Sequence, residues 1–225
     1  MKKLKFIGVG GAMNLELGGN CCYLKDGDNL LVIDACEDAT KKLVEEDAFK
    51  GVKNIYIAIT HTHYDHVAGL GILIWYANFV LKIKPTIIYK TFRYKCNLKK
   101  LLKITGVNKK HFNLIKDSDF NIDGLTIEFK KTMHAPELQC FGFMFSDNKG
   151  KYYYTGDSND VKYVRELCND DSVKTIYCEV ATETFDVHIK YDDIKDLSKD
   201  KLVLMHVNTM DLYKQIKKDG FSVGL

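Results

Sequence analysis

The chain has 225 residues, of which 46% are hydrophobic and 28% are charged, and its formal net charge is +3. These values are typical of a globular protein with a sizeable core, so we expect a single domain over residues 1–225. A net charge this small does not by itself indicate nucleic-acid binding. The longest apolar segment, residues 67–83, contains polar side chains and a lysine, so no membrane-spanning segment and no membrane partner are predicted.

Seven cysteines are present, and none of them shows the CxxC spacing of a zinc ribbon. The apolar run near the first residue is too short for a secretory signal and lacks a cleavage site. We therefore expect reduced thiols in a cytoplasmic protein.

Predicted strands and helices follow one another in two successive halves. In the first half, strands are predicted at residues 4–9, 20–25, 30–34, 55–59, 85–89 and 112–115, and helices at 39–49, 67–81 and 94–104. In the second half, strands are predicted at 120–122, 125–130, 141–145, 151–155, 175–180 and 202–206, and helices at 160–168 and 210–218. This alternation predicts an α/β fold with two central sheets and helices outside them.

The most informative motif is the segment Thr60–Gly69, which follows a short apolar run typical of a buried strand. It places His61, His63, Asp65 and His66 within six positions. Imidazole and carboxylate groups are the ligands that divalent metals such as zinc bind. Three of the seven histidines of the chain fall in this segment, so a metal site is favoured over a surface loop without chemistry.

Three more polar side chains follow predicted strands. They are His134, Asp157 and His206. Taken alone, each of the three is more often a residue at the end of a strand that has no function. Together with the histidine segment they provide the ligands that a second metal ion needs, because the ends of several strands project to a common rim.

The HxHxDH pattern of residues 61–66 resembles the signature of the metallo-β-lactamase fold superfamily, and the resemblance covers nearly the whole chain. It implies a four-layer αβ/βα sandwich with two divalent metal ions at the edge of the sheets. Zinc is expected, and manganese, iron or cobalt suit the same ligands. The resemblance assigns one metal to His61, His63 and His134 and the other to Asp65, His66 and His206, with Asp157 bridging the two.

The segments around Glu179 and His188 resemble the Glu and His motifs of ribonuclease Z and its phosphodiesterase relatives. The resemblance implies that His188, oriented by Glu179, donates a proton to a leaving alkoxide, a poor leaving group that benefits from a general acid. We therefore place these two residues with Asp65 in the catalytic set. Ile189 follows His188 where the family usually has serine, so a surface Glu and His without a function remain the alternative.

The spacing of the later motifs narrows the substrate. Residues 134 and 157 are only 23 positions apart, which leaves no room for the long arm with which ribonuclease Z grips tRNA, so folded RNA is disfavoured. Only 19 residues follow His206, which disfavours the extra helical domain of glyoxalase II-type thioesterases. The sequence resembles the compact branch that includes cyclic-nucleotide phosphodiesterases, some of which, in phages, destroy cyclic mononucleotides used as bacterial defence signals.

We therefore expect a two-metal phosphodiesterase with a cyclic mononucleotide as its best candidate substrate. The alternatives are a ribonuclease Z-like RNA 3′-processing nuclease, a small-molecule ester, lactone or lactam hydrolase, and a non-catalytic nucleotide-binding scaffold. Tyr64, Phe141 and Phe185 are candidates to stack on a base, and core packing explains them equally well. The apolar helix expected at residues 67–81 favours a homodimer, although burial within the monomer also accounts for it.

Overall fold

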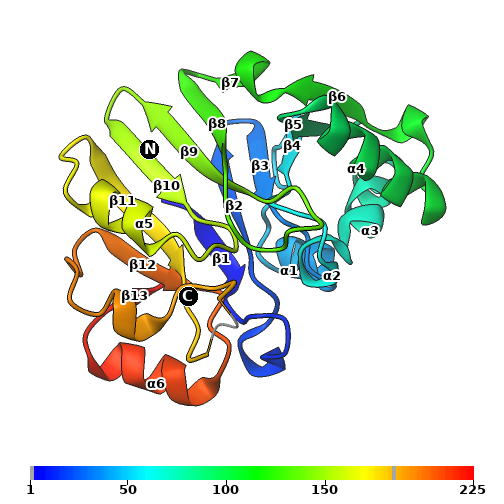
Figure 1. The fold of residues 1–225 in the computed structure, drawn as a ribbon. Coiled ribbons are helices and arrows are strands. Elements are labelled where there is room, and N and C mark those ends of the chain that lie inside the picture. Colours follow the sequence, from blue (N-terminus) through cyan, green and yellow to red (C-terminus); the bar gives the residue numbers. More distant parts are fainter. Residues whose placement is uncertain (1–2, 184–185) are drawn as a thin grey trace.

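Two β-sheets make up the centre of the computed structural model, which describes residues 3–183 and 186–225 (Figure 1). Within these residues the first sheet has six strands, ordered β1-β2-β3-β4-β5-β6. Its strands are β1 (Lys5–Gly8), β2 (Cys21–Asp26), β3 (Asn29–Ile33), β4 (Asn54–Ala58), β5 (Thr86–Tyr89) and β6 (Asn113–Lys116). The pairs from β3 to β6 are parallel, whereas β1, β2 and β3 pair antiparallel.

The second sheet is built from the later half of the chain. Over the described residues it has seven strands, ordered β13-β12-β11-β10-β9-β8-β7. They are β7 (Asn121–Ile122), β8 (Leu125–Lys131), β9 (Phe141–Asp147), β10 (Gly150–Tyr154), β11 (Val173–Glu179), β12 (Leu202–Met205) and β13 (Ser222–Val223). The strands from β10 to β13 are parallel, and those from β7 to β10 are antiparallel.

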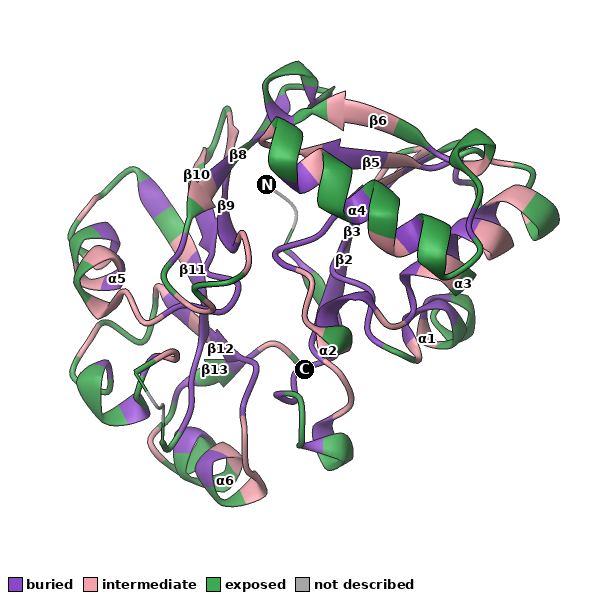
Figure 2. Cartoon of the chain, turned by 45° about the vertical axis from the view of Figure 1, so that its right-hand side comes forward, coloured by how far each residue is buried: buried purple, intermediate pink, exposed green. Residues whose placement is uncertain are grey.

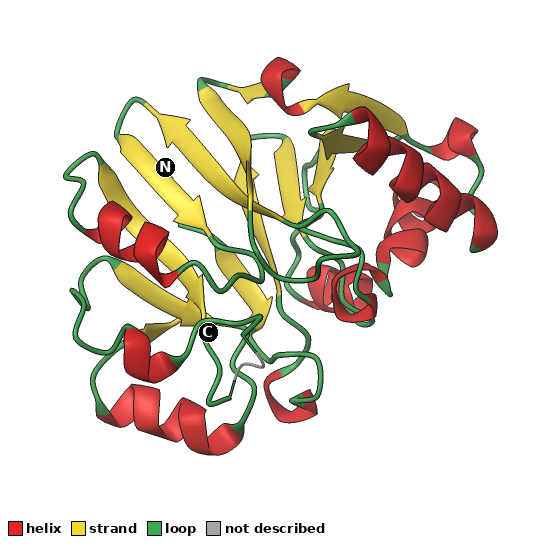
Figure 3. Cartoon of the chain, viewed as in Figure 1, coloured by secondary structure: helices red, strands yellow, loops and turns green. Residues whose placement is uncertain are grey.

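Helices lie on the outer sides of the two sheets (Figure 3). The α-helices are α1 (Ala39–Glu45), α2 (Tyr64–Val67), α3 (Leu70–Trp75), α4 (Phe92–Ile104), α5 (Val161–Cys168) and α6 (Met210–Lys218). Short 3-10 turns occupy Leu15–Leu17, Lys109–His111, Asp117–Asp119 and Tyr191–Asp193, and a π-helical turn occupies Tyr76–Val80. The parallel strands require these helices as crossover connections. The predicted α/β class with two central sheets and outer helices is confirmed.

Aromatic side chains join the two sheets. Phe6 of β1 packs against Tyr154 and Tyr177 of the second sheet, with ring centroids 6.5 and 5.7 Å apart. The Tyr177 hydroxyl also accepts a hydrogen bond from the Leu4 backbone N–H at 3.1 Å. Figure 2 shows buried residues along the strands and exposed residues on the outer surfaces of the helices. The core is therefore continuous across the sheet interface, and the sheet edges are held in a fixed relation.

The prediction of one continuous helix over residues 67–81 is wrong, because the structure interrupts it. The structure has α2, then α3 from Leu70, then the π-helical turn. The break falls at Gly69, where a Cβ atom would lie 2.1 Å from the Cys36 carbonyl oxygen. The Gly69 N–H instead donates to the Ala35 carbonyl at 2.9 Å. This close backbone contact fixes the direction in which the chain leaves the histidine segment.

Among the described residues, no helix is both long enough and apolar enough to cross a membrane.

Candidate metal centre

Three imidazoles converge at the end of the first sheet. We call His61, His63 and His134 the first triad. His61 and His63 lie in the loop that follows β4, and His134 follows β8 of the other sheet. His63 Nδ1 lies 2.9 Å from His61 Nε2 and 3.1 Å from His134 Nε2. The Val187 carbonyl lies 2.9 Å from His134 Nδ1 and fixes the plane of that ring. Two segments about 70 residues apart thus present one set of nitrogens.

A second group lies beside the first. We call Asp65, His66 and His206 the second triad. The first two belong to α2, and His206 follows β12. Asp65 Oδ2 lies 3.2 Å from His66 Nε2 and 3.3 Å from His206 Nε2. His206 has a φ angle of +52°, a region that residues other than glycine rarely adopt. This backbone conformation ends β12 one residue before the predicted limit and turns the imidazole towards Asp65.

Asp157 lies between the two triads. It follows β10 and is 3% exposed. Its Oδ2 atom lies 3.6 Å from His134 Nε2, 3.9 Å from His61 Nε2 and 3.5 Å from His206 Nε2. Its Oδ1 atom lies 3.4 Å from His66 Nε2. One carboxylate therefore reaches both groups, as a bridging ligand must.

Two buried polar atoms at this place lack a hydrogen bond. They are His66 Nε2 and Asp157 Oδ1. Carboxylate oxygens lie within 3.4 Å of His66 Nε2, but their directions make no hydrogen bond. Buried polar groups are normally satisfied, so unpaired ones need an explanation. Nitrogen and oxygen ligand atoms that lie within 4.8 Å of one another form several groups here, and this donor set fits divalent metal ions.

Burial sets the protonation of the first triad. It lowers the pKa of His61, His63 and His134, which keeps these imidazoles in the neutral form that binds metals. Burial alone would raise the pKa of Asp157, but the imidazoles of the second triad outweigh this effect and hold that pKa well below its usual range. The first triad therefore offers neutral nitrogens beside an ionised carboxylate, the charge state that metal binding requires. In the second triad the neighbouring carboxylates, Asp157 foremost, outweigh burial and raise the pKa of His66 and His206.

Asp34 supports the second triad, and the sequence analysis did not assign it a role. It follows β3, which is parallel to β4. Its carboxylate lies 2.9 Å from His66 Nδ1 and accepts a hydrogen bond from the Thr60 N–H at 2.7 Å. A carboxylate only accepts, so His66 Nδ1 carries the proton and Nε2 is free to bind a metal. The signal that could have found Asp34 is its place directly after the apolar strand 30–33, the same signal that identified the other ligands.

Glu179 and His188, the two residues that the resemblance paired, lie in contact. Glu179 ends β11 and is fully buried. Its Oε2 atom lies 2.8 Å from His188 Nδ1 and 3.8 Å from His206 Nδ1, and its Oε1 atom accepts the Ser158 N–H. Burial and the charge of Asp157 raise the pKa of Glu179. The His188 side chain is 23% exposed, so its ring joins a buried acid to the surface of the site.

A cavity of about 430 Å³ opens over these residues. Both triads contribute to its wall, together with Asp157 and His188. Its rim is formed by the loop that carries Met13, which is 91% exposed, and by Glu183 and Asn208. The candidate ligands, the His–Glu pair and the open space therefore belong to a single site.

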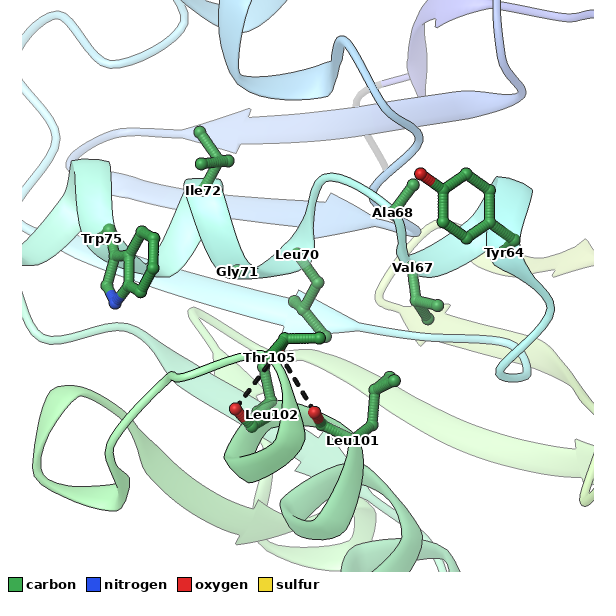
Figure 4. A pocket seen from close by; sticks show the side chains of 10 residues that line it. All are labelled: Tyr64, Val67, Ala68, Leu70, Gly71, Ile72, Trp75, Leu101, Leu102 and Thr105. Atoms are coloured by element: carbon green, nitrogen blue, oxygen red, sulfur yellow. Dashed lines mark hydrogen bonds between the residues drawn. The ribbon is translucent and has the colours of Figure 1, made fainter.

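The three aromatic residues considered for base stacking do not line this cavity among the described residues. Tyr64 is 79% exposed but borders a separate apolar hollow of about 240 Å³ between α3 and α4 (Figure 4). Phe141 is buried against Tyr94 and Phe129, so core packing, the alternative explanation, accounts for it. Phe185 lies outside the described residues.

Two mixed sheets with outer helices, and a His/Asp centre where their edges meet, define the metallo-β-lactamase fold with a candidate metal centre. The chain belongs to the family of the anti-Pycsar protein Apyc1, whose model matches residues 2–223. The predicted superfamily is thereby confirmed.

Solved structures share this fold at low sequence identity. The metallo-β-lactamase fold protein YhfI from Bacillus subtilis is 19% identical, with 98% of this chain and 94% of that chain covered and a TM-score of 0.75. The short form of human tRNase Z is 18% identical, with 92% and 93% covered and a TM-score of 0.65. Zinc-bound PqqB from Methylobacterium extorquens is 12% identical, with 98% and 96% covered and a TM-score of 0.71. No curated protein sequence matches the chain.

Proposed function

We propose that this chain is a two-metal phosphodiesterase that opens the phosphodiester ring of a cyclic mononucleotide and so removes a defence signal. The observation that carries the proposal is the hydrogen bond between His188 and the buried Glu179, at the wall of the cavity that both triads share. Membership of the family of the anti-Pycsar protein Apyc1 supports the proposed biological role.

The metal-binding part of the proposal uses the two triads. His61, His63 and His134 would hold one ion, the second triad would hold the other, and Asp157 would bridge them. Two bound dications supply a nucleophile at neutral pH and stabilise the negative charge that grows on the phosphoryl oxygens. Asp34 keeps His66 in the tautomer whose Nε2 atom faces this place.

His188 provides the proton that the leaving group needs. Hydrolysis adds the oxygen of water to phosphorus and breaks one ring P–O bond, and the released ribose oxygen must gain a proton. Glu179 binds His188 Nδ1 and leaves Nε2 free to donate towards the cavity. Because Glu179 is fully buried and also accepts a backbone N–H, it fixes the direction of the ring rather than reacting itself.

The shape of the site supports a small substrate. Between His134 and Asp157 the chain forms the hairpin of β9 and β10. A tight turn joins the two strands, and their pairing begins at Asp147 and Gly150. No arm extends from the described residues of this interval to hold a folded RNA. A cavity of about 430 Å³ matches a mononucleotide in size, since small-molecule sites span about 300–1,000 Å³.

A substrate panel tests the proposal. Purified protein loaded with zinc or manganese is incubated with 3′,5′-cyclic mononucleotides, a precursor tRNA, and ester, lactone and lactam substrates, and the products are separated by chromatography. We expect linear mononucleotides from the cyclic substrates. Cleavage of precursor tRNA alone would favour the nuclease alternative, and tight nucleotide binding without turnover would favour the scaffold.

A substitution of His188 tests its role as the proton donor. His188→Ala should lower kcat for the cyclic nucleotide by about 10²–10⁴-fold while the metal content stays unchanged, because general acid catalysis contributes about that much. His111→Ala is the matched control, since His111 lies outside the cavity and is partly exposed. Undiminished phosphodiester hydrolysis by the His188 variant would favour the ester, lactone or lactam hydrolase.

The proposal also includes zinc as the metal, a cytoplasmic location and a homodimer. Exposed apolar side chains support the dimer, because Ile72 of α3 and Phe79 and Val80 of the following π-helical turn are 54–59% exposed. Light scattering should give the mass of two 25.8 kDa chains, and Ile72→Glu should reduce it to that of one. The mass of a single chain for the wild type would contradict this part.

A further inference from the structure

The small net charge of the chain conceals a strong separation of charge. Residues 82–116 contain eleven of the 33 Lys and Arg residues and none of the 30 Asp and Glu residues. The rest of the chain therefore has 22 basic residues against 30 acidic ones and is negative overall. The basic segment comprises β5, α4, the turn at Lys109–His111 and β6.

Most of these cations point to solvent. The apolar face of α4, formed by Tyr94, Leu98 and Leu102, is buried against the sheet, and the opposite face is exposed (Figure 2). In the described part of the chain, Lys90 is the one cation of this segment that forms an ion pair, with Asp117 at 2.9 Å. The exposed cations are Lys82, Lys84, Arg93, Lys99, Lys100, Lys103, Lys109, Lys110 and Lys116.

Three of these lysines surround a hollow with an apolar floor. The hollow has a volume of about 340 Å³ and lies between the end of α4 and the following turn. Lys99, Lys103 and Lys109 line it together with Asn108, and Val107 and Phe112 form its buried floor. No carboxylate contributes to its lining. The surface therefore offers positive charge around a space large enough for a planar ring.

The hollow is separate from the candidate metal centre. Because β5 and β6 are parallel, α4 must return the chain from the end of β5 to the start of β6. The helix begins near the candidate metal centre: the hydroxyl of Thr91, which precedes α4, donates to the side chain of Gln139, in the segment between His134 and β9, at 3.0 Å. Its 13 residues span about 20 Å, which places Lys103 towards the opposite edge.

We propose that this basic surface binds single-stranded nucleic acid. The surface consists of the hollow lined by lysines and the exposed cations of α4 beside it. Lys99 and Lys103 lie one helical turn apart and can contact successive phosphates, while the apolar floor accepts an unpaired base. In a duplex the bases are stacked and paired, so the floor would find no partner. A membrane-binding helix would expose its apolar face, whereas α4 buries its apolar face.

Binding is measured on the full-length protein by fluorescence anisotropy with a labelled single strand of about 20 nucleotides. The first variant combines Lys99→Gln, Lys103→Gln and Lys109→Gln. The control combines Lys214→Gln, Lys217→Gln and Lys218→Gln on α6, which removes the same charge from another exposed helix. Both variants leave the candidate metal centre intact, so hydrolysis of cyclic nucleotides reports separately on the proposed function.

We expect wild-type binding in the micromolar range at low salt. The first variant should lose at least about tenfold in affinity, and its slope of log K against log salt should fall by about two, since each single-strand phosphate contact contributes about 0.7. The α6 variant should stay within about twofold of the wild type. The proposal would be overturned if the wild type did not bind or if both variants lost affinity equally. Stronger binding to duplex DNA, to an acidic peptide or to phosphatidylserine vesicles would also overturn it.

Discussion

Asp34 determines how one ligand of the second triad is presented. Its carboxylate is fully buried and holds both the Thr60 N–H and the His66 Nδ1 atom, and its φ angle of +59° turns it into this position. Asparagine tolerates that backbone region, so Asp34→Asn removes the charge while keeping the conformation. The comparison therefore isolates the electrostatic contribution of the carboxylate.

We expect Asp34→Asn to reduce metal affinity and hydrolysis by about 10–100-fold, the usual effect of losing a partner that orients a metal-binding histidine. Metal content after dialysis and kcat for the cyclic nucleotide measure the two effects. Asp28→Asn, at an exposed ion pair with Lys53, is the control. Wild-type metal content and activity in the Asp34 variant would show that Thr60 alone orients His66.

At the scale of elements, a glycine positions the bridging carboxylate. Gly156 has a φ angle of +58°, and a Cβ atom there would lie 2.6 Å from the Phe141 carbonyl oxygen. Gly27 in the β2–β3 turn has nearly the same φ, +57°, with no atom within 4 Å of the corresponding Cβ position. The pair separates the cost of the backbone conformation from the cost of the contact.

Gly156→Ala should lower the free energy of unfolding by about 1–3 kcal/mol and should reduce metal content, because the backbone before Asp157 must shift. Gly27→Ala should cost less and leave metal content unchanged. Chemical denaturation and metal analysis measure both quantities. Equal destabilisation by the two substitutions would mean that the contact with β9 has no effect.

The elements differ in how well the sequence predicts them. The hairpin of β2 and β3 is predicted because two apolar runs flank the turn residues Asp26–Asn29, and every proposed metal ligand could be found because it follows a strand or lies in the histidine segment. The break at Gly69 could not be predicted, since it depends on the Cys36 backbone. The place of Asp34 after an apolar strand marks it as a candidate, but its contact with His66 depends on the parallel pairing of β3 and β4, which a linear pattern does not reveal.

At the scale of the whole molecule, the proposed ligands come from both sheets. His61, His63 and the α2 residues follow β4, whereas His134, Asp157 and His206 follow β8, β10 and β12. Metal bound between the sheets would stabilise their association, because the unfolded chain does not hold these groups together. The centre is therefore expected to affect stability as well as activity.

We expect chelation by EDTA to lower the melting temperature, and saturating metal to raise the free energy of unfolding by about 2.7 kcal/mol when the free metal is 100 times its dissociation constant. Differential scanning calorimetry measures the change. In the Asp157→Asn variant, added metal should change the melting temperature less than it does in the wild type. An identical melting temperature with and without metal would contradict binding between the sheets.

The position of His206 has a consequence for protein synthesis. This residue follows β12, which pairs with β11 only after about nine-tenths of the sequence has been made. The second triad therefore cannot be complete on a nascent chain that lacks β12, although the histidine segment has emerged long before. Activity should appear late and all at once, so interrupted translation products would carry most of the ligands and none of the catalysis.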